Sequence, residues 1–356
     1  MTAQSVPDDR VLDKSGPTAL AFYCPIPLSF HPNAKLVQDR SFDWMERLRL
    51  FGDATMPREN ALATDSARVT GSMIPEASDE LLLLYVTYMY WGYQVDDFFD
   101  TGTVTQRRHQ YRALIPRLLR ALEAPLAQVA DDPPHVALLR GMRRYLDENV
   151  SAALVRLWVD ANQAWLLGVA LELDDALTET LPGIDEYLFT KLFDGAARTV
   201  TITVEVCGGT ELPAAERESP AVTALTHAAG MLINLYADVS SHAKETPTDR
   251  NIVNVLRAEG RSRDQALAEA VELCDRIMLL FLELRRQTLP RVSSSTSVYL
   301  TNLGTTLSGV LDWCAMTARF AAAAGRPHVT RTDQPSRYGL TPPPYPNIAW
   351  WWDQLD

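Results

Sequence analysis

Residues 81–100 read LLLLYVTYMYWGYQVDDFFD, an apolar and aromatic run that ends in three aspartates. Apolar residues at three- and four-residue spacing predict a helix, on which Asp96 and Asp100 share a face and Asp97 lies about 100° around the axis. Carboxylates this close repel one another unless a cation lies between them, and Mg²⁺ suits one or two carboxylates completed by water and phosphate oxygens. Two interpretations stay open at this point, a metal site and an ordinary solvated helix end.

Helical spacing continues along most of the chain and indicates one all-α domain. The β-branched stretch RTVTITVEV at 198–206 has no evident partner strand, and we therefore expect a strained or partly unwound helix there. Helical patterning begins near Trp44. The helices predicted by apolar spacing cover residues 79–100, 105–123, 134–150, 151–173, 184–207, 219–244, 263–287 and 294–322.

The two ends of the chain differ from its body in composition. Residues 1–17 are polar and acidic and predict a disordered lead, whereas residues 18–335 carry the helical pattern. Residues 336–356 form a tail rich in proline and tryptophan. Its three consecutive tryptophans, which begin at Trp350, predict an anchor that docks on the body rather than a chemical role.

Composition limits the classes of function. The 356 residues are 47% hydrophobic and carry a formal net charge of −12, with no basic run that would track nucleic acid. There is no uninterrupted apolar stretch of about 18 residues that would predict a membrane span, and the N-terminus lacks an apolar signal core. We expect a cytoplasmic protein without a nucleic-acid partner.

A second set of polar side chains lies in NLYADVSSHAKE at 234–245. On a helix, Ser241 and Glu245 share a face because they are four residues apart, with Lys244 beside them and Ala237 one turn earlier. A metal ion held by one helix end needs ligands from a facing element. This segment offers such ligands.

With both motifs in view, the chain resembles the bacterial class I terpene synthases. That family has a D-D-x-x-D motif on one helix and an N-D-x-x-S-x-x-x-K-E-like motif on the facing helix. The resemblance runs from FYCPIPLSFHP at 22–32 to GVLDWCAMTARF at 309–320, nearly the whole chain. It implies an α-helical bundle around a central active-site cavity, and cyclisation of farnesyl or geranylgeranyl diphosphate to a terpene hydrocarbon or alcohol. A homodimer is one expected assembly.

The resemblance also assigns roles to single residues. Lys191, in EYLFTKLFDG at 186–195, matches the family's diphosphate sensor and precedes Ala237 by 46 positions, the separation typical of the family. Asp194 and Gly195 match the linker and effector that couple diphosphate contact to ionisation. The implied ligands of three Mg²⁺ ions are Asp96, Asp97, Asp100, Ser241 and Glu245, and the implied diphosphate contacts are Lys191, Lys244 and Arg319.

Aromatic side chains near these motifs are candidates for a wall that steadies a carbocation, namely Tyr93, Trp165, Trp313 and Phe320. Ordinary core packing is the alternative for each, because large aromatic residues commonly fill interiors. The family's Arg-Tyr pair has two candidates in this chain. One is Arg319 with Phe320, and the rival is Arg337 with Tyr338.

Three positions near the diphosphate depart from the family pattern. Ala237 stands where a metal-ligating Asn is expected, Lys191 where Arg is usual, and Phe320 where Tyr is usual. Alanine cannot ligate a metal, and Asp238 or Asn234 would compensate only if their helix rotated or bent. A non-catalytic or weakened prenyl-diphosphate-binding relative is therefore the alternative. A chain-elongating synthase is disfavoured because the chain has only one D-D-x-x-D motif.

Overall fold

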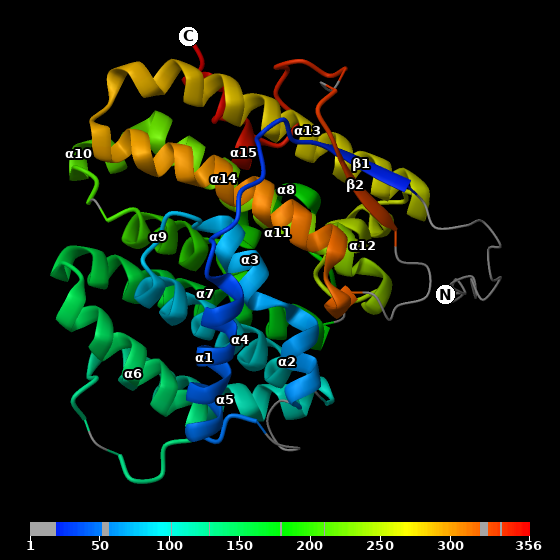
Figure 1. Ribbon diagram of the computed structural model, residues 1–356. Helices are drawn as coiled ribbons and strands as arrows, with labels where there is room; N and C mark the ends of the chain where they lie inside the picture. The colour runs from blue at the N-terminus through cyan, green and yellow to red at the C-terminus, as the bar shows by residue number, and fades with distance from the viewer. Residues whose placement is uncertain are drawn as a thin grey trace, which may run out of the picture.

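Most of the chain folds into helices that pack around one another (Figure 1). The computed structural model describes residues 19–51, 57–100, 102–127, 129–178, 180–209, 211–320, 327–334 and 337–356, with the side chain of Asp100 excepted. The predicted lead at 1–17 therefore lies outside the described residues. The prediction of an all-α class is confirmed.

The helices of the first half are α1 (Ala34–Arg47), α2 (Arg58–Thr64), α3 (Ser66–Met73), α4 (Asp79–Asp100), α5 (Val104–Glu123), α6 (Pro134–Asn149) and α7 (Ala152–Thr178). Helices α4 to α7 lie close to their predicted positions, whereas α2 and α3 were not predicted. The predicted start of helical structure near Trp44 is wrong, because α1 begins at Ala34. Its buried apolar residues, Val37, Phe42 and Met45, include two that precede Trp44.

The second half continues the same arrangement with three long helices, several short ones and short 3-10 turns. The α-helices are α8 (Ile184–Asp194), α9 (Ala197–Cys207), α10 (Ala214–Arg217), α11 (Pro220–Ser241), α12 (Ile252–Ala258), α13 (Arg263–Thr288), α14 (Ser294–Met316) and α15 (Pro346–Ala349). The 3-10 turns are η1 (His242–Lys244), η2 (Leu289–Arg291), η3 (Ala318–Phe320) and η4 (Trp352–Gln354).

Helix α11 forms the centre of the bundle and packs against α8, α9, α13 and α14. Its side chains Leu225, Leu232 and Leu235 are completely buried, as expected for a helix that is apolar on nearly every side. Each such side chain contributes about 1.5–3 kcal/mol by its removal from water. Helix α4 packs against α1, α3, α5 and α6, so its aromatic run is also enclosed by helices.

The helix predicted over 184–207 is in fact two helices. α8 ends at Asp194, and α9 begins at Ala197 after Ala196, which has a left-handed backbone with φ 58°. A Cβ atom at Gly195 would lie 2.3 Å from Asn234 Oδ1 on α11. The amide of Asn234 donates to the Lys191 carbonyl at 2.6 Å. The break therefore depends on a glycine that lets α11 approach the end of α8.

The β-branched segment at 198–206 lies within α9 and is helical, as predicted. It is not unwound, since the chain leaves helical geometry at Ala196, before the segment begins. Its threonine hydroxyls donate to carbonyls three or four residues earlier, as in Thr199 to Ala196 and Thr203 to Thr199. This bonding satisfies the hydroxyls inside a buried helix.

Two short strands escaped the sequence analysis. β1 (Ala19–Tyr23) and β2 (His328–Thr332) pair in parallel, with Ala19 opposite His328 and Tyr23 opposite Thr332. Figure 1 shows them side by side next to α13, where the Tyr23 amide donates to Asp275 Oδ1 at 2.9 Å. Each strand has five residues, too few to show strand periodicity against the helical pattern around them.

The end of the chain packs on the body beside α8 and α11. Trp351 is completely buried, and the rings of Trp350 and Trp351 lie 6.2 and 6.4 Å from His227 of α11. Asn347 donates from its backbone amide to Asp185 Oδ1 at 2.9 Å, at the start of α8. Among the described residues, no helix combines the length and apolar character needed to cross a membrane.

Candidate active site

The last turn of α4 holds two acids against an arginine from a distant part of the chain. Arg319 of η3 donates to Asp97 Oδ1 at 2.6 Å and to Asp97 Oδ2 at 3.1 Å, and its Nη2 lies 3.6 Å from Asp96 Oδ2. This bidentate pair offsets the unfavourable position of acids at the negative end of a helix. The side chains of Asp96 and Asp97 are 50% and 44% exposed, so both remain accessible to a ligand.

Asp96 lies in the electrostatic field of three cations. Desolvation raises the pKa of Asp96, the charge of Arg319 opposes the rise, and Asp97 adds to it. Lys244 and Lys191 also lower the pKa, which shows that both lysines lie within electrostatic reach of this acid. The Asp96 side chain is half exposed to water, and it is still desolvated by the protein atoms around it.

Aromatic rings lie directly beside this ion pair. Tyr93 stacks on Trp313 with ring centroids 5.7 Å apart, and Trp313 meets Phe320 edge-on at 5.3 Å. The Arg319 guanidinium lies 4.6 Å from the Tyr93 ring, and Lys244 Nζ lies 5.6 Å from the Phe320 ring. Three candidate wall residues and two candidate diphosphate contacts thus form one continuous group at the end of α4.

Lys191 lies at the end of α8 between two buried carboxylates. Its Nζ is 3.0 Å from Asp238 Oδ1 on α11 and 3.8 Å from Asp194 Oδ1. Desolvation acts to lower the pKa of Lys191, but the charges of Asp238 and Asp194 outweigh it, and the pKa is raised. The lysine is therefore held as a cation in a buried position.

Arg250 is a functional candidate that the sequence analysis missed. Its Nη2 lies 3.5 Å from Asp194 Oδ2 and its Nη1 lies 3.0 Å from Asp175 Oδ2, while only 3% of its side chain is exposed. It precedes α12 in the polar segment TPTDRN, where a lone arginine reads as a solvated charge. The sequence carried no signal of its burial.

The comparisons with known proteins agree over most of the chain. Residues 87–278 match the family model described as terpene synthase family 2, C-terminal metal binding. Spiroviolene synthase from Streptomyces violens is 30% identical over 345 residues, which are 93% of this chain and 95% of that protein. Phomopsene synthase from Allokutzneria albata is 31% identical over 340 residues, again 93% of this chain and 95% of the relative.

A solved structure supports the same assignment. The crystal structure of SVS_A2, a protein from ancestral sequence reconstruction, superposes with a TM-score of 0.78 at 32% identity, over 94% of this chain and 98% of that one. The chain belongs to the terpene synthase family. As in its relatives, the fold is that of the class I terpene synthases, and the protein is a terpene cyclase, a lyase that acts on a diphosphate.

The second polar segment, predicted to be a metal motif, lies at the end of α11 and just after η1. Ser241 Oγ donates to Glu245 Oε1. Burial raises the pKa of Glu245 to about 7, the charge of Asp238 adds to the rise, and the Ser241 hydrogen bond opposes it. Among the described residues, no group of three or more His, Cys, Asp and Glu side chains is gathered closely enough to hold a metal by itself.

The donors that are present nevertheless fit a hard cation. α4 offers two carboxylates, and the end of α11 offers a hydroxyl and a carboxylate, all of them oxygen ligands. Mg²⁺ keeps several water ligands and accepts one or two carboxylates from a protein. The family description and this donor set agree on metal binding. The side chain of Asp100, the third acid of the first motif, lies outside the described residues.

Neither neighbour of Ala237 replaces the missing ligand. Asp238 Oδ2 accepts from the Ile252 amide at 3.0 Å and from the Tyr187 hydroxyl, and its Oδ1 binds Lys191. The Asn234 side chain donates to the Lys191 carbonyl and packs against Gly195, at the break between α8 and α9. The rotation or bend that would turn either residue toward a metal is absent, since α11 continues as a helix to Ser241.

The structure separates the remaining candidates. Trp165 lies with Trp91 at a centroid distance of 5.9 Å and is not part of the stack beside Arg319. Arg337 is exposed and donates to Tyr338 at 2.7 Å, whereas Arg319 lies at the acid cluster. Gly195 and Asp194 lie at the break, next to Lys191.

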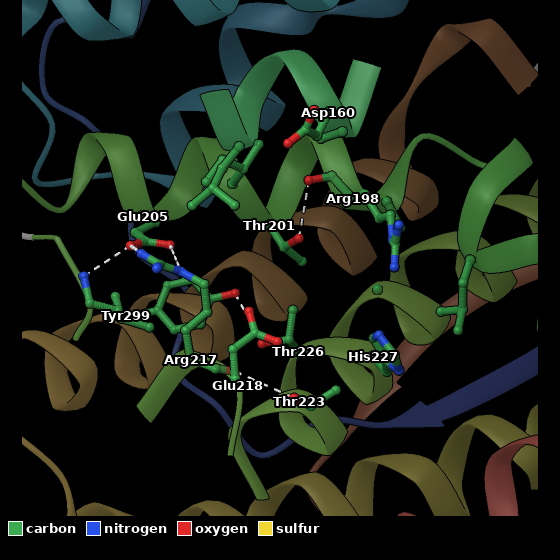
Figure 2. A pocket seen from close by; sticks show the side chains of 17 residues that line it. Asp160, Arg198, Thr201, Glu205, Arg217, Glu218, Thr223, Thr226, His227 and Tyr299 are labelled. Carbon is green, nitrogen blue, oxygen red and sulfur yellow. Dashed lines mark hydrogen bonds and ion pairs between the residues drawn. The ribbon is translucent and has the colours of Figure 1, made fainter. Parts of the chain in front are cut away.

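A second pocket of about 300 Å³ lies between α7, α9 and α11 (Figure 2). Four of its polar side chains form two pairs, since Arg217 binds Glu205 and the Thr226 and Tyr299 hydroxyls are 3.1 Å apart. It lies along the face of α9 that carries Thr201 and Glu205, away from Thr199 and Thr203.

Proposed function

We propose that this terpene synthase uses Mg²⁺ to ionise farnesyl or geranylgeranyl diphosphate and cyclises the resulting allyl cation to a terpene hydrocarbon or alcohol, with release of diphosphate. One observation carries the proposal: Asp96 and Asp97 face Arg319, and Lys244 and Lys191 act on the same acid. Acids that can hold metal ions and cations that can hold phosphate thus meet at the end of one bundle.

The metal ions would be held by the acids of α4 and by the end of α11. We assign Asp96, Asp97 and Asp100 to one wall and Ser241 and Glu245 to the other, with three Mg²⁺ ions expected from the resemblance. Bound Mg²⁺ supplies Lewis-acid neutralisation of the diphosphate as its C–O bond breaks. Ala237 leaves one ligand position to water, which Mg²⁺ retains readily.

The chain's own cations would bind and orient the diphosphate. Lys244 is exposed beside Phe320, and Arg319 already carries a fork geometry suited to phosphate. Lys191 would act as the sensor, and its place at the end of α8 links it to Asp194 and Gly195. Contact between Lys191 and a diphosphate would therefore act directly on the break between α8 and α9.

The aromatic group would steady the carbocation and exclude water. Tyr93, Trp313 and Phe320 are in mutual contact, and their rings can each contribute about 0.5–2 kcal/mol to a nearby cation. Trp313 is fixed by a hydrogen bond from Nε1 to the Thr64 carbonyl at 2.6 Å. A fixed wall favours one folded conformation of the substrate chain.

Ala237 favours a second candidate function, a weakened or non-catalytic binder of prenyl diphosphates. One assay separates the two: purified protein with Mg²⁺ and geranyl, farnesyl or geranylgeranyl diphosphate, followed by product analysis and by measurement of diphosphate release. A cyclic product that disappears with EDTA supports the cyclase. Tight binding of a substrate with no turnover of any of the three would instead support the second candidate.

Location and assembly remain predictions from the sequence. The net charge of −12 supports an enzyme without a nucleic-acid partner. A cytoplasmic location is a separate prediction. A homodimer is the expected assembly if the enzyme is not monomeric, and light scattering on the purified protein distinguishes the two states.

A further inference from the structure

Asp194 is a buried carboxylate held by charge alone. Its side chain is 2% exposed, Oδ1 lies 3.8 Å from Lys191 Nζ, and Oδ2 lies 3.5 Å from Arg250 Nη2. Neither oxygen has a hydrogen-bond partner among the described residues. A buried acceptor without hydrogen bonds is costly and needs an explanation. Each oxygen of Asp194 therefore faces a different cation across a gap that a small movement would close.

Arg250 is fixed independently of Asp194. Its Nη1 lies 3.0 Å from Asp175 Oδ2 on α7, and its Nη2 also donates to Thr190 Oγ1 on α8. Buried arginine side chains suit this task because the planar guanidinium has several donors in a fixed arrangement. The guanidinium thus stays in place whatever happens to Lys191.

The second carboxylate that holds Lys191 also has other partners. Asp238 Oδ2 accepts from the Ile252 amide at 3.0 Å and from the Tyr187 hydroxyl. Both acids around Lys191 therefore keep a partner if the lysine turns away. Without such partners, removal of one cation from two buried acids would be strongly unfavourable.

We propose that Arg250 is a positioning residue that takes over the Asp194 carboxylate when Lys191 turns to the diphosphate. The inference rests on the proposed function, because it assigns Lys191 to diphosphate. The backbone of Asp194 packs closely on α7, since a Cβ on Gly168 would lie 2.4 Å from its amide nitrogen. A side-chain movement of about half an ångström would bring Oδ2 from 3.5 Å to hydrogen-bond distance of Arg250.

The test is a titration of inorganic diphosphate into the protein with Mg²⁺ present, followed by calorimetry. In Arg250→Gln, Asp194 depends on Lys191 alone, so diphosphate should bind about tenfold more weakly. Arg250→Lys keeps a cation beside Asp194 and should stay within about threefold of the wild type. The double variant Arg250→Gln with Asp194→Asn should recover affinity, because Asp194 then no longer competes for the lysine and only Asp238 remains beside it, as in the wild type.

Arg217→Gln is the matched control. Arg217 pairs with the buried Glu205 in the second pocket (Figure 2), so its loss also removes a partner from a buried carboxylate. It should lower the melting temperature and leave diphosphate affinity unchanged. Equal weakening in Arg217→Gln and Arg250→Gln, or wild-type affinity in folded Arg250→Gln, would overturn the inference.

Two further readouts keep the inference testable. If Arg250→Gln does not fold, Asp194→Asn alone should bind diphosphate at least as tightly as the wild type, and weaker binding contradicts the exchange of partners. Turnover of prenyl diphosphate is measured separately on the wild type. If the wild type turns over prenyl diphosphate but Arg250→Gln binds inorganic diphosphate as tightly as the wild type, only the inference about Arg250 is wrong. If the variants show the expected binding pattern but the wild type has no turnover, only the proposed function is wrong.

Discussion

The two walls of the proposed site, one at the end of α4 and one at the end of α11, stabilise their acidic side chains in different ways. On α4, Asp96 and Asp97 are about half exposed and are balanced by the guanidinium of Arg319. At the end of α11, Glu245 is held by the Ser241 hydroxyl, and burial raises its pKa to about 7. The acids of the first wall are held by an ion pair. The acid of the second wall is held by a hydrogen bond, and its pKa is close to neutral pH. Metal ligands can thus be kept in a folded protein either by a counter-charge or by partial protonation.

The first wall should show the largest effect on substitution. Asp96→Asn removes a carboxylate that no other described group replaces, and turnover should fall by about 10³-fold or more. The same change removes the desolvation cost of the Asp96 charge and its repulsion with Asp97, which together outweigh the lost attraction to Arg319, so the melting temperature without metal should stay equal or rise. Product analysis and thermal unfolding check the two effects. Retained turnover with an intact fold would show that Asp96 is no metal ligand.

Loss of the counter-charge should have the next largest effect. Arg319→Gln leaves two adjacent carboxylates without their guanidinium and removes one diphosphate contact, so turnover should fall by about 10²-fold. Added Mg²⁺ should raise the melting temperature of this variant more than that of the wild type, because the metal replaces the lost charge. The exposed Arg337→Gln is the control and should change neither property. An equal effect of Mg²⁺ on both proteins would argue against the ion-pair description of the first wall.

On the second wall, a substitution that adds a metal ligand should leave Mg²⁺ affinity unchanged or strengthen it, in contrast to the losses expected on the first wall. Ala237→Asn adds an amide oxygen one turn before Ser241, at a position that is only partly buried. The Mg²⁺ concentration for half-maximal turnover should stay unchanged or fall by up to about tenfold. Metal titration of turnover measures it. Loss of activity with folding intact would mean that position 237 does not face the metal.

The contrast between the walls also marks what a sequence can predict. Helical periodicity placed Asp96, Asp97 and Asp100 on α4. Ser241 and Glu245 were expected on one helix, but α11 ends at Ser241 and Glu245 follows η1 in extended backbone, where the two side chains still meet. The roles of these residues at a metal come from the family resemblance and stay predictions. The break at Gly195 was missed because it depends on the close approach of Asn234 from α11, a contact between distant segments. Arg250 was missed for the same reason, since nothing in TPTDRN indicates that Asp175 and Asp194 will surround its side chain.

Substitution of Phe320 should have the smallest effect on turnover. It is also the most specific test, because Phe320 contacts both the aromatic group and a proposed diphosphate-binding lysine. Its ring contacts Trp313 and lies 5.6 Å from Lys244 Nζ, and the residue is 5% exposed. Phe320→Tyr adds a hydroxyl that must find a partner or cost about 1 kcal/mol. If the diphosphate accepts its hydrogen bond, kcat/KM should rise by up to about threefold while the product stays the same. Phe320→Leu, which removes the ring, should instead change the product ratio. A Tyr variant that alters the product and leaves kcat/KM unchanged would place this ring against the hydrocarbon chain rather than at the diphosphate.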